Sequence, residues 1–143
     1  MALKPTTTSL HLASVADLIG IDPADLETAF VCEEWSAELS TGLVWLGPET
    51  AALHGAPATR CGIMDLMQLY EPGDWQKVLL ALEEAATIST TFSFATTLRP
   101  GPRLYRPVFC FGRSETEDGI IEGTFAIARL CLETASARRD TLN

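Results

Sequence analysis

Residues 69–86, LYEPGDWQKVLLALEEAA, end one short apolar segment and start a longer one within very few positions. Pro72 and Gly73 break the chain, and Asp74 stands where a helix N-cap is expected. From Trp75 onward, apolar residues recur at the i, i+3, i+4 and i+7 spacing of one helix face. Those residues are Trp75, Val78, Leu79 and Leu82. The stretch therefore predicts a sharp stop, a turn, and a helix with one buried face.

Short elements are predicted before this junction. Residues 31–39 and 43–46 have strand character, and Ser40-Thr41-Gly42 between them is a plausible hairpin turn. A short helix over residues 49–54 follows Pro48 and ends at Gly55. A second helical stripe consists of Ile63, Leu66, Met67 and Tyr70.

Residues 1–30 are predicted to form an N-terminal helical extension. Ser14-Val-Ala-Asp17 resembles a capping box with Asp in place of Glu, and Asp22 followed by Pro23 restarts a helix. The first of these helices carries an apolar stripe that is a candidate dimer interface, made of Leu12, Val15, Leu18 and Ile19.

The last third of the chain is predicted to be extended. In STTFSFATTL, every second residue from Phe92 to Leu98 shares one face, the spacing of a half-buried strand. LYRPVFCF and IIEGTFAIARL supply two more strands, and Pro107 marks an edge position or a bulge because it cannot donate to a ladder. The expected fold is α+β. It is a five-stranded antiparallel sheet with short helices and one longer helix on one face, preceded by the N-terminal helices.

Composition narrows the classes of function that are expected for the chain. The chain has 143 residues and a net charge of −9, which argues against phosphate and nucleic-acid binding. No apolar run approaches the roughly 20 residues of a membrane span, and the N-terminus is a poor signal peptide. The four cysteines are scattered without a CxxC pair, as expected of a reduced, cytoplasmic protein with buried thiols.

Four pieces of the chain resemble a PAS domain, closest to the variety common in bacterial sensor kinases. They are WSAELSTGLVWLGPETAALHG, LYEPGDWQKVLLALEEA, TLRPGPRLYRP and IIEGTFAIA, in the family's order and spacing. The resemblance covers residues 31–130 and leaves 131–143 as a short tail. It implies that the helix after Asp74 walls the domain's pocket. It also implies a sensory or regulatory role, either as a stand-alone PAS protein or as part of a longer one.

Departures from the family pattern bear on coupling to an output domain. The family's last strand often ends in Gly-Thr-x-x-Asp-Ile-Thr, whose Asp helps anchor a signalling helix. Gly123 and Thr124 match this pattern, but Ile127 stands at the Asp position and Arg129 at the Thr position.

The residue types for catalysis, metal binding or a resident cofactor are sparse, and an enzyme is not expected. His54 is predicted to be a helix-end residue where the dipole favours a cation, and Glu33-Glu34 and Glu83-Glu84 are predicted to be solvated. The haem-binding members' histidine is missing from residues 75–86. Around Cys61, the light-sensing members' Gly-x-Asn-Cys-Arg-Phe-Leu-Gln motif is missing too. Neither haem nor flavin is expected.

An apolar interior remains as the candidate site, and its residues either fill the core or line a ligand pocket. The pocket candidates are Trp35, Leu43, Trp45, Leu53, Met64, Val78, Leu79, Leu82, Phe92, Phe94, Phe109 and Phe125. The first functional hypothesis is a regulatory module that acts by homodimerisation and by binding a signalling protein such as a histidine kinase. The alternative is a sensor whose pocket takes an apolar or weakly polar metabolite.

Overall fold

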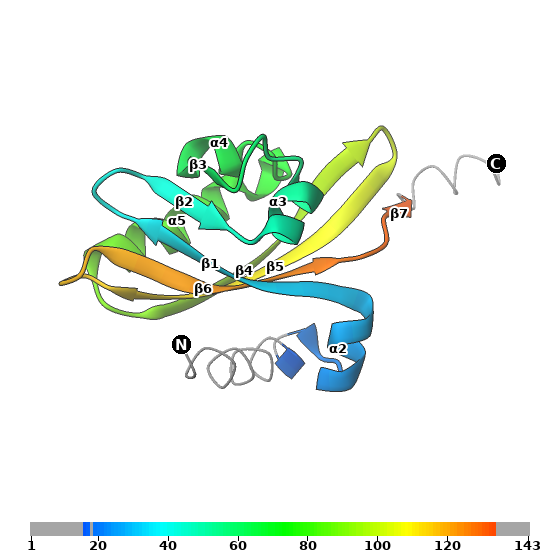
Figure 1. Cartoon of the computed structure of the whole chain (residues 1–143), viewed down its shortest axis with the longest axis horizontal. Helices are drawn as coiled ribbons and strands as arrows, with labels where there is room; N and C mark the ends of the chain where they lie inside the picture. The colour runs from blue at the N-terminus through cyan, green and yellow to red at the C-terminus, as the bar shows by residue number, and fades with distance from the viewer. Residues whose placement is uncertain (1–15, 18, 134–143) are drawn as a thin grey trace.

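A computed structural model describes residues 16–17 and 19–133 of the chain. Its strands form one antiparallel sheet in the order β3-β2-β1-β6-β5-β4, and β7 pairs with β5 off this path (Figure 1). The strands are β1 (Phe30–Glu38), β2 (Leu43–Leu46), β3 (Arg60–Gly62), β4 (Thr91–Gly101), β5 (Leu104–Glu115), β6 (Ile120–Ala128) and β7 (Leu132–Glu133). The helices are α2 (Pro23–Ala29), α3 (Pro48–His54), α4 (Ile63–Met67), the 3₁₀ turn η1 (Pro72–Asp74) and α5 (Trp75–Thr87).

The predicted α+β class and antiparallel sheet are confirmed. The five expected strands correspond to β1, β2, β4, β5 and β6, while β3 and β7 were not predicted. These two strands are three and two residues long. Such short strands show too little alternation to be recognised.

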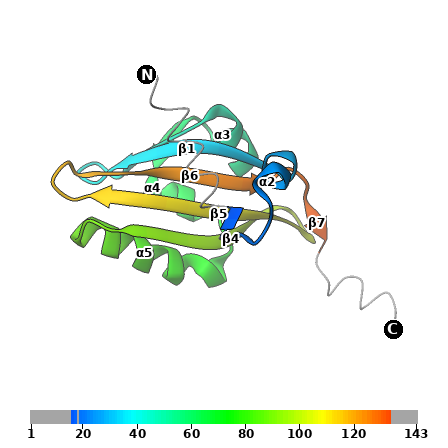
Figure 2. The same ribbon diagram turned by 90° about the horizontal axis from the view of Figure 1, so that it is seen from below.

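The sheet separates two groups of helices. Helices α3, α4 and α5 lie on one face, here called the inner face, and α2 lies on the outer face (Figures 1 and 2). Asp22 caps α2 by accepting a 3.0 Å hydrogen bond from the Ala24 N–H, and Pro23 takes the first helical position. Most of the first predicted N-terminal helix, including Leu12, Val15 and Leu18, lies outside the described residues.

The inner face carries the main core because one side of each strand is apolar. On β4, burial alternates from Phe92 to Leu98 as predicted. Trp35 of β1 packs on Phe125 of β6 with ring centroids 5.4 Å apart, and its edge meets Phe92 at 6.4 Å. Aromatic contacts in the core therefore join β1 both to its neighbour β6 and to β4, which lies at the far edge of the sheet.

Beside this aromatic cluster, the backbones of β5 and β6 approach each other closely. Gly112 of β5 pairs with Gly123 of β6, and the Phe92 ring lies directly over Gly112. A side chain at Gly123 would collide with the Phe111 carbonyl oxygen and the Gly112 Cα. Gly123, which matches the PAS pattern in the sequence, is thus needed for strand packing.

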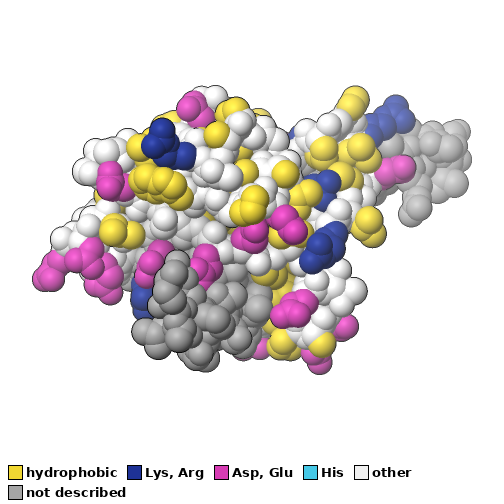
Figure 3. Space-filling view, viewed as in Figure 1, with side chains coloured by type: hydrophobic (Ala, Val, Ile, Leu, Met, Phe, Trp, Pro, Cys, Tyr) yellow, Lys and Arg dark blue, Asp and Glu magenta, His cyan; other side chains and the backbone are white. Residues whose placement is uncertain are grey.

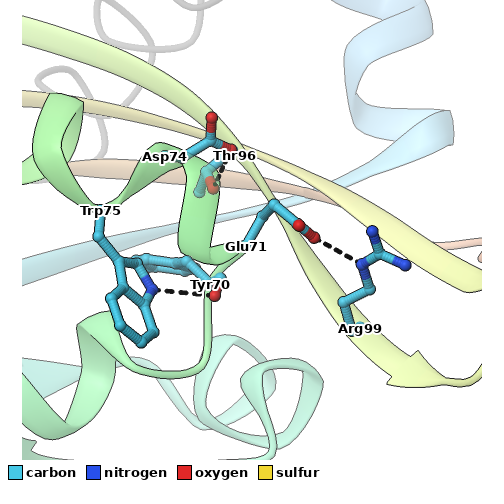
Figure 4. A network of polar contacts seen from close by, with 6 residues as sticks. All are labelled: Tyr70, Glu71, Asp74, Trp75, Thr96 and Arg99. Atoms are coloured by element: carbon cyan, nitrogen blue, oxygen red, sulfur yellow. Dashed lines mark hydrogen bonds and ion pairs between the residues drawn. The ribbon is translucent and has the colours of Figure 1, made fainter.

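The junction before α5 differs from its prediction. Asp74 stands at the N-cap position, but its side chain makes no capping hydrogen bond, because η1 precedes α5 and gives Asp74 a helical backbone. Its carboxylate instead accepts a 2.8 Å hydrogen bond from the Thr96 hydroxyl and lies 3.5 Å from the Lys77 ammonium. Asp74 therefore ties α5 to β4 (Figure 4).

Further contacts hold this junction against β4. Tyr70 forms an isolated bridge with Leu98, and its carbonyl accepts a 3.1 Å hydrogen bond from the Trp75 indole. Glu71 accepts a 2.6 Å charge-assisted hydrogen bond from Arg99 (Figure 4). The segment between α4 and α5 is thus fixed to the end of β4.

Glu33 is not the solvated residue that the sequence predicts. Its carboxylate accepts a 2.6 Å hydrogen bond from the Thr50 N–H at the start of α3. The N-cap residue of α3 is Gly47, which has no side chain to do this, and the Glu33 carboxylate occupies the space where a Gly47 Cβ would stand. A side chain from β1 therefore caps α3 in place of a local residue.

A second apolar cluster, the outer cluster, lies between α2 and the outer face. Its fully buried members are Ala16, Leu26 and Ala126, and partly buried residues packed around them are Ile19, Ile21, Phe30, Cys32, Phe109 and Phe111. Phe30 and Phe109 meet edge to face at 5.8 Å. Ile19, a candidate dimer residue, therefore packs against its own chain.

Candidate functional site

The interior between the inner face and α3–α5 holds one small cavity. Its volume is about 20 Å³, and it is lined by Trp35, Val44, Ile63, Leu66, Met67, Tyr70, Val78, Leu82, Phe94, Cys110 and Phe125. A single water needs roughly 10–15 Å³ by this measure, and apolar cavities of this kind stay dry. In this conformation the interior has no room for a metabolite.

A larger groove, the mouth groove, opens beside this cavity. It measures about 190 Å³ and is lined by Ala37, Glu38, Leu39, Gly42, Ile63, Met64, Met67, Leu79, Leu82, Glu83 and Ala86. Ile63, Met67 and Leu82 also line the inner cavity, so these three side chains separate the cavity from the groove.

The predicted pocket residues divide between these places. Trp35, Val78, Leu82, Phe94 and Phe125 line the cavity. Phe92 packs beside it, stacked on Phe94 with ring centroids 6.4 Å apart. Leu79 and Met64 line the mouth groove, and Met64 is exposed.

Four of the predicted residues lie neither beside the cavity nor in the mouth groove. Phe109 lies in the outer cluster, and Trp45 and Leu43 pair with outer-face residues of β1, with Trp45 40% exposed. Leu53 lines a different groove near the β4–β5 hairpin. The prediction for Phe109 is wrong because Phe109 and Cys110 alternate along β5, and Cys110 takes the inner position opposite Phe125.

A buried polar pair in the core was missed by the sequence reasoning. The His54 Nδ1 lies 2.8 Å from the Thr50 carbonyl oxygen, and its Nε2 lies 2.8 Å from the Tyr70 hydroxyl. A carbonyl only accepts, so Nδ1 carries the proton and the Tyr70 hydroxyl donates to Nε2. The residues stand 16 positions apart, and no sequence signal joins them.

His54 is consequently neutral, which corrects the predicted cationic helix end. Burial lowers the pKa of His54 to about 4, and the hydrogen bond with the Thr50 backbone opposes this only in part. Burial also raises the pKa of Tyr70 well above its usual value. Both side chains are uncharged at neutral pH, and their contacts leave neither ring nitrogen of His54 without a partner.

The thiols are poor nucleophiles. Burial raises the pKa of Cys110 well above its ordinary value, with the Trp35 contact opposing, and it raises the pKa of Cys61 with a contribution from Asp65. The pKa of Cys32 is raised to about 11, chiefly by burial and then by Glu27. Thiolates are the reactive form, so none of these three cysteines has the character of a catalytic residue.

The interior does not fit the cofactors known in PAS proteins. A cavity of about 20 Å³ is far below the roughly 300 Å³ or more of a cofactor pocket. Both ring nitrogens of His54 are engaged within the protein, so neither is free for a haem iron. Over residues 16–17 and 19–133, no group of three or more His, Cys, Asp or Glu side chains could hold a metal ion.

The part of the chain that the structure describes also contains no helix long and apolar enough to cross a membrane.

Comparisons with known proteins identify the fold of the chain. No family model and no curated protein matches the chain. Among solved structures, an RNA-binding Light-Oxygen-Voltage receptor aligns over 78% of this chain at 13% identity with a TM-score of 0.54. The chain spans only about a third of that receptor, 34% of its length.

Two bacterial sensor proteins are similar to the same extent. A sensory box histidine kinase/response regulator from Burkholderia thailandensis E264 aligns over 77% of this chain and 82% of that one, with 17% identity and a TM-score of 0.50. The N-terminal domain of a diguanylate cyclase with a PAS/PAC sensor from Marinobacter aquaeolei aligns over 76% of this chain and 99% of that one, with 15% identity and a TM-score of 0.53. The chain has the PAS fold, as its sequence resemblance predicted.

Proposed function

We propose that this chain is a non-enzymatic PAS-type regulatory module that acts in bacterial signal transduction through homodimerisation and binding of a signalling protein, such as a histidine kinase. The observation that carries the proposal is the filled interior. A cavity of about 20 Å³ leaves little room for a ligand in this conformation, which favours surface contacts as the means of regulation. The expected setting is the cytoplasm.

The dimer is proposed to form through the N-terminal stripe of Leu12, Val15, Leu18 and Ile19, together with the outer face of the sheet. In support, Ala16 and Ile19 lie in the outer cluster, and Ile19 is only partly buried there, so part of its side chain is left for a partner. PAS dimers often use such a flanking helix together with the outer sheet face, which is the resemblance on which this step depends.

Analytical ultracentrifugation tests the dimer. Val15→Asp combined with Leu18→Asp is expected to shift the protein towards monomer, because charge would enter an apolar contact. Leu80→Asp is the matched control, since Leu80 is an apolar residue that is 58% exposed on α5, whereas Ile19, the described residue of the stripe, lies in the outer cluster. A wild-type protein that stays monomeric at all concentrations contradicts the proposal, and so does an equal shift with Leu80→Asp.

A specific observation also supports the alternative, a small-molecule sensor. Ile63, Met67 and Leu82 line both the inner cavity and the mouth groove, so movement of these side chains is proposed to join the two spaces. Native mass spectrometry of the purified protein separates the hypotheses. A stoichiometric co-purified small molecule favours the sensor, and a ligand-free dimer favours the contact module.

A further inference from the structure

A second groove lies outside the interior just described, between the end of α3 and the β4–β5 hairpin. It measures about 440 Å³ and is lined by Ala52, Leu53, His54, Gly55, Leu69, Leu98, Arg99, Pro100 and Arg106. We propose that this basic groove binds a small organic carboxylate with an apolar body. The proposal does not depend on the proposed function, because it concerns another site and other residues.

Charge is the first argument. The chain has a net charge of −9 and only ten lysines and arginines, yet two arginines line this groove. None of the described residues that line it is acidic. Figure 3 shows hydrophobic and basic side chains together over the β4–β5 hairpin, whereas acidic side chains gather over the β5–β6 turn at the other end of the molecule. The lining of the groove is thus positively charged on an otherwise acidic protein, although the Glu71 carboxylate, which pairs with Arg99, lies beside it.

The hydrogen bonding of Arg106 is the second argument. Its Nη1 donates to the carbonyls of Ala128 at 2.6 Å and Arg129 at 2.7 Å, which fixes the guanidinium in place. Its Nε is buried and has no hydrogen-bond partner in the described structure. Buried donors are almost always paired, so Arg106 has hydrogen-bonding capacity that the protein does not use. A carboxylate in the groove is proposed to take it up through a small movement of the atoms that cover Nε.

Arg99 supplies the second positive charge. Its Nε donates to Glu71, which fixes the side chain, and the side chain remains 50% exposed. Arg106 pairs with Leu98, the neighbour of Arg99, across the β4–β5 ladder. The two arginines therefore come from adjacent strands of one hairpin, and both line the groove.

The remaining lining selects an apolar body. Leu53, Leu69 and Leu98 supply apolar surface from three separate parts of the chain. Small-molecule sites typically occupy roughly 300–1,000 Å³ and combine apolar walls with a few polar groups that fix orientation. A carboxylate with an aliphatic or aromatic body satisfies both features, whereas inorganic phosphate would leave the apolar walls unused.

An NMR titration of the full chain with octanoate tests the proposal. We expect saturable shifts of the backbone amides of Gly55, Leu98 and Arg106. Octan-1-ol and inorganic phosphate should each bind at least about tenfold more weakly than octanoate. Octan-1-ol lacks the carboxylate, and phosphate lacks the apolar body.

Two arginine variants provide the matched comparison. Arg99→Gln should weaken octanoate binding about tenfold, the size expected for losing one charge-assisted contact. Arg113→Gln is the control, because Arg113 is similarly exposed at 54% and also pairs with a glutamate, Glu122, but lies on the outer face. Arg99 is substituted rather than Arg106, because loss of Arg106 would also remove its hydrogen bonds to Ala128 and Arg129 and could unfold the hairpin.

Several outcomes overturn the proposal. These are the absence of saturable shifts, shifts centred on Met64 and Leu79 of the mouth groove, equal binding of octan-1-ol or phosphate, and equal effects of the two arginine variants. The first three remove the site or its chemistry, and the last shows only a general effect of charge.

Discussion

The two faces of the sheet hold aromatic residues in different ways. Phe125 on the inner face is 2% exposed and is enclosed by Trp35 and His54, whereas Phe109 on the outer face is only partly buried beside Phe30. The inner face is covered by α3, α4 and α5, and in the described chain the outer face is covered by α2 and a few residues before it. The same alternation of residues therefore gives a sealed core on one side and a shallow contact on the other.

The largest expected effect compares these two phenylalanines. Phe125→Ala should lower the free energy of unfolding by about 3–5 kcal/mol, because a large cavity opens in a core that cannot collapse around it. Phe109→Ala should cost about half as much, since Phe109 is less buried. Urea titrations measure both, and an equal or larger cost for Phe109→Ala would show that the outer cluster is as tightly sealed as the core.

Acid should weaken the inner face through His54. Its pKa is lowered to about 4 in the folded protein, below the ordinary value of 6.5, so the unfolded chain binds a proton more readily. Stability is then complete above pH 6.5 and falls as the pH drops towards 4, by a total on the order of 3 kcal/mol.

Urea midpoints at several pH values measure this slope, and His54→Gln provides the control. Between pH 5 and 6.5, where carboxylates titrate little, the wild type should lose stability and the variant should not. Parallel slopes for the two proteins would mean that His54 is not the responsible group.

A smaller effect concerns the contact between α5 and β4. Asp74→Ala should cost about 1 kcal/mol, because it removes the acceptor of the nearly buried Thr96 hydroxyl. Thr96→Val should cost a similar amount, and the double variant less than the sum of both. Additive costs in this double-mutant cycle would instead support the helix-capping role that the sequence predicted for Asp74.

The smallest effect is expected next to it, at Gly73. Gly73 is not among the glycines with positive φ, and a Cβ there would meet no atom within 4 Å. Gly73→Ala should therefore be neutral or stabilise by up to about 1 kcal/mol, through the lower entropy of the unfolded chain. A clear loss of stability in the same urea assay would mean that the turn needs glycine for another reason.

The predictable part of the fold came from strong periodicity and turn chemistry. The alternation in β4, the turn before Leu43 and the helical stripe from Trp75 each have one dominant physical explanation. The phase of β5 could not be decided in this way, because Val108, Phe109, Cys110 and Phe111 are all apolar. Either face of that run could have been the inner one, and for this reason Phe109 was misplaced.

Polar contacts within the candidate site were beyond sequence reasoning. The pairs His54–Tyr70 and Asp74–Thr96 join residues 16 and 22 positions apart through side chains. Of these four residues, only Thr96 could be noticed in the sequence, because it is a polar residue on the apolar face of β4. Arg106 similarly gains its role from carbonyls on another strand, which no local pattern reveals.

The three tryptophans give this protein three separate optical reporters. Trp35 is buried beside the cavity, Trp75 is partly buried at the start of α5, and Trp45 is 40% exposed on the outer side of β2. An indole emits at shorter wavelength in a dry apolar environment than in water. Variants that keep one tryptophan each would therefore report separately on the core, on the α4–α5 junction and on the outer side of β2, through the emission wavelength of each indole.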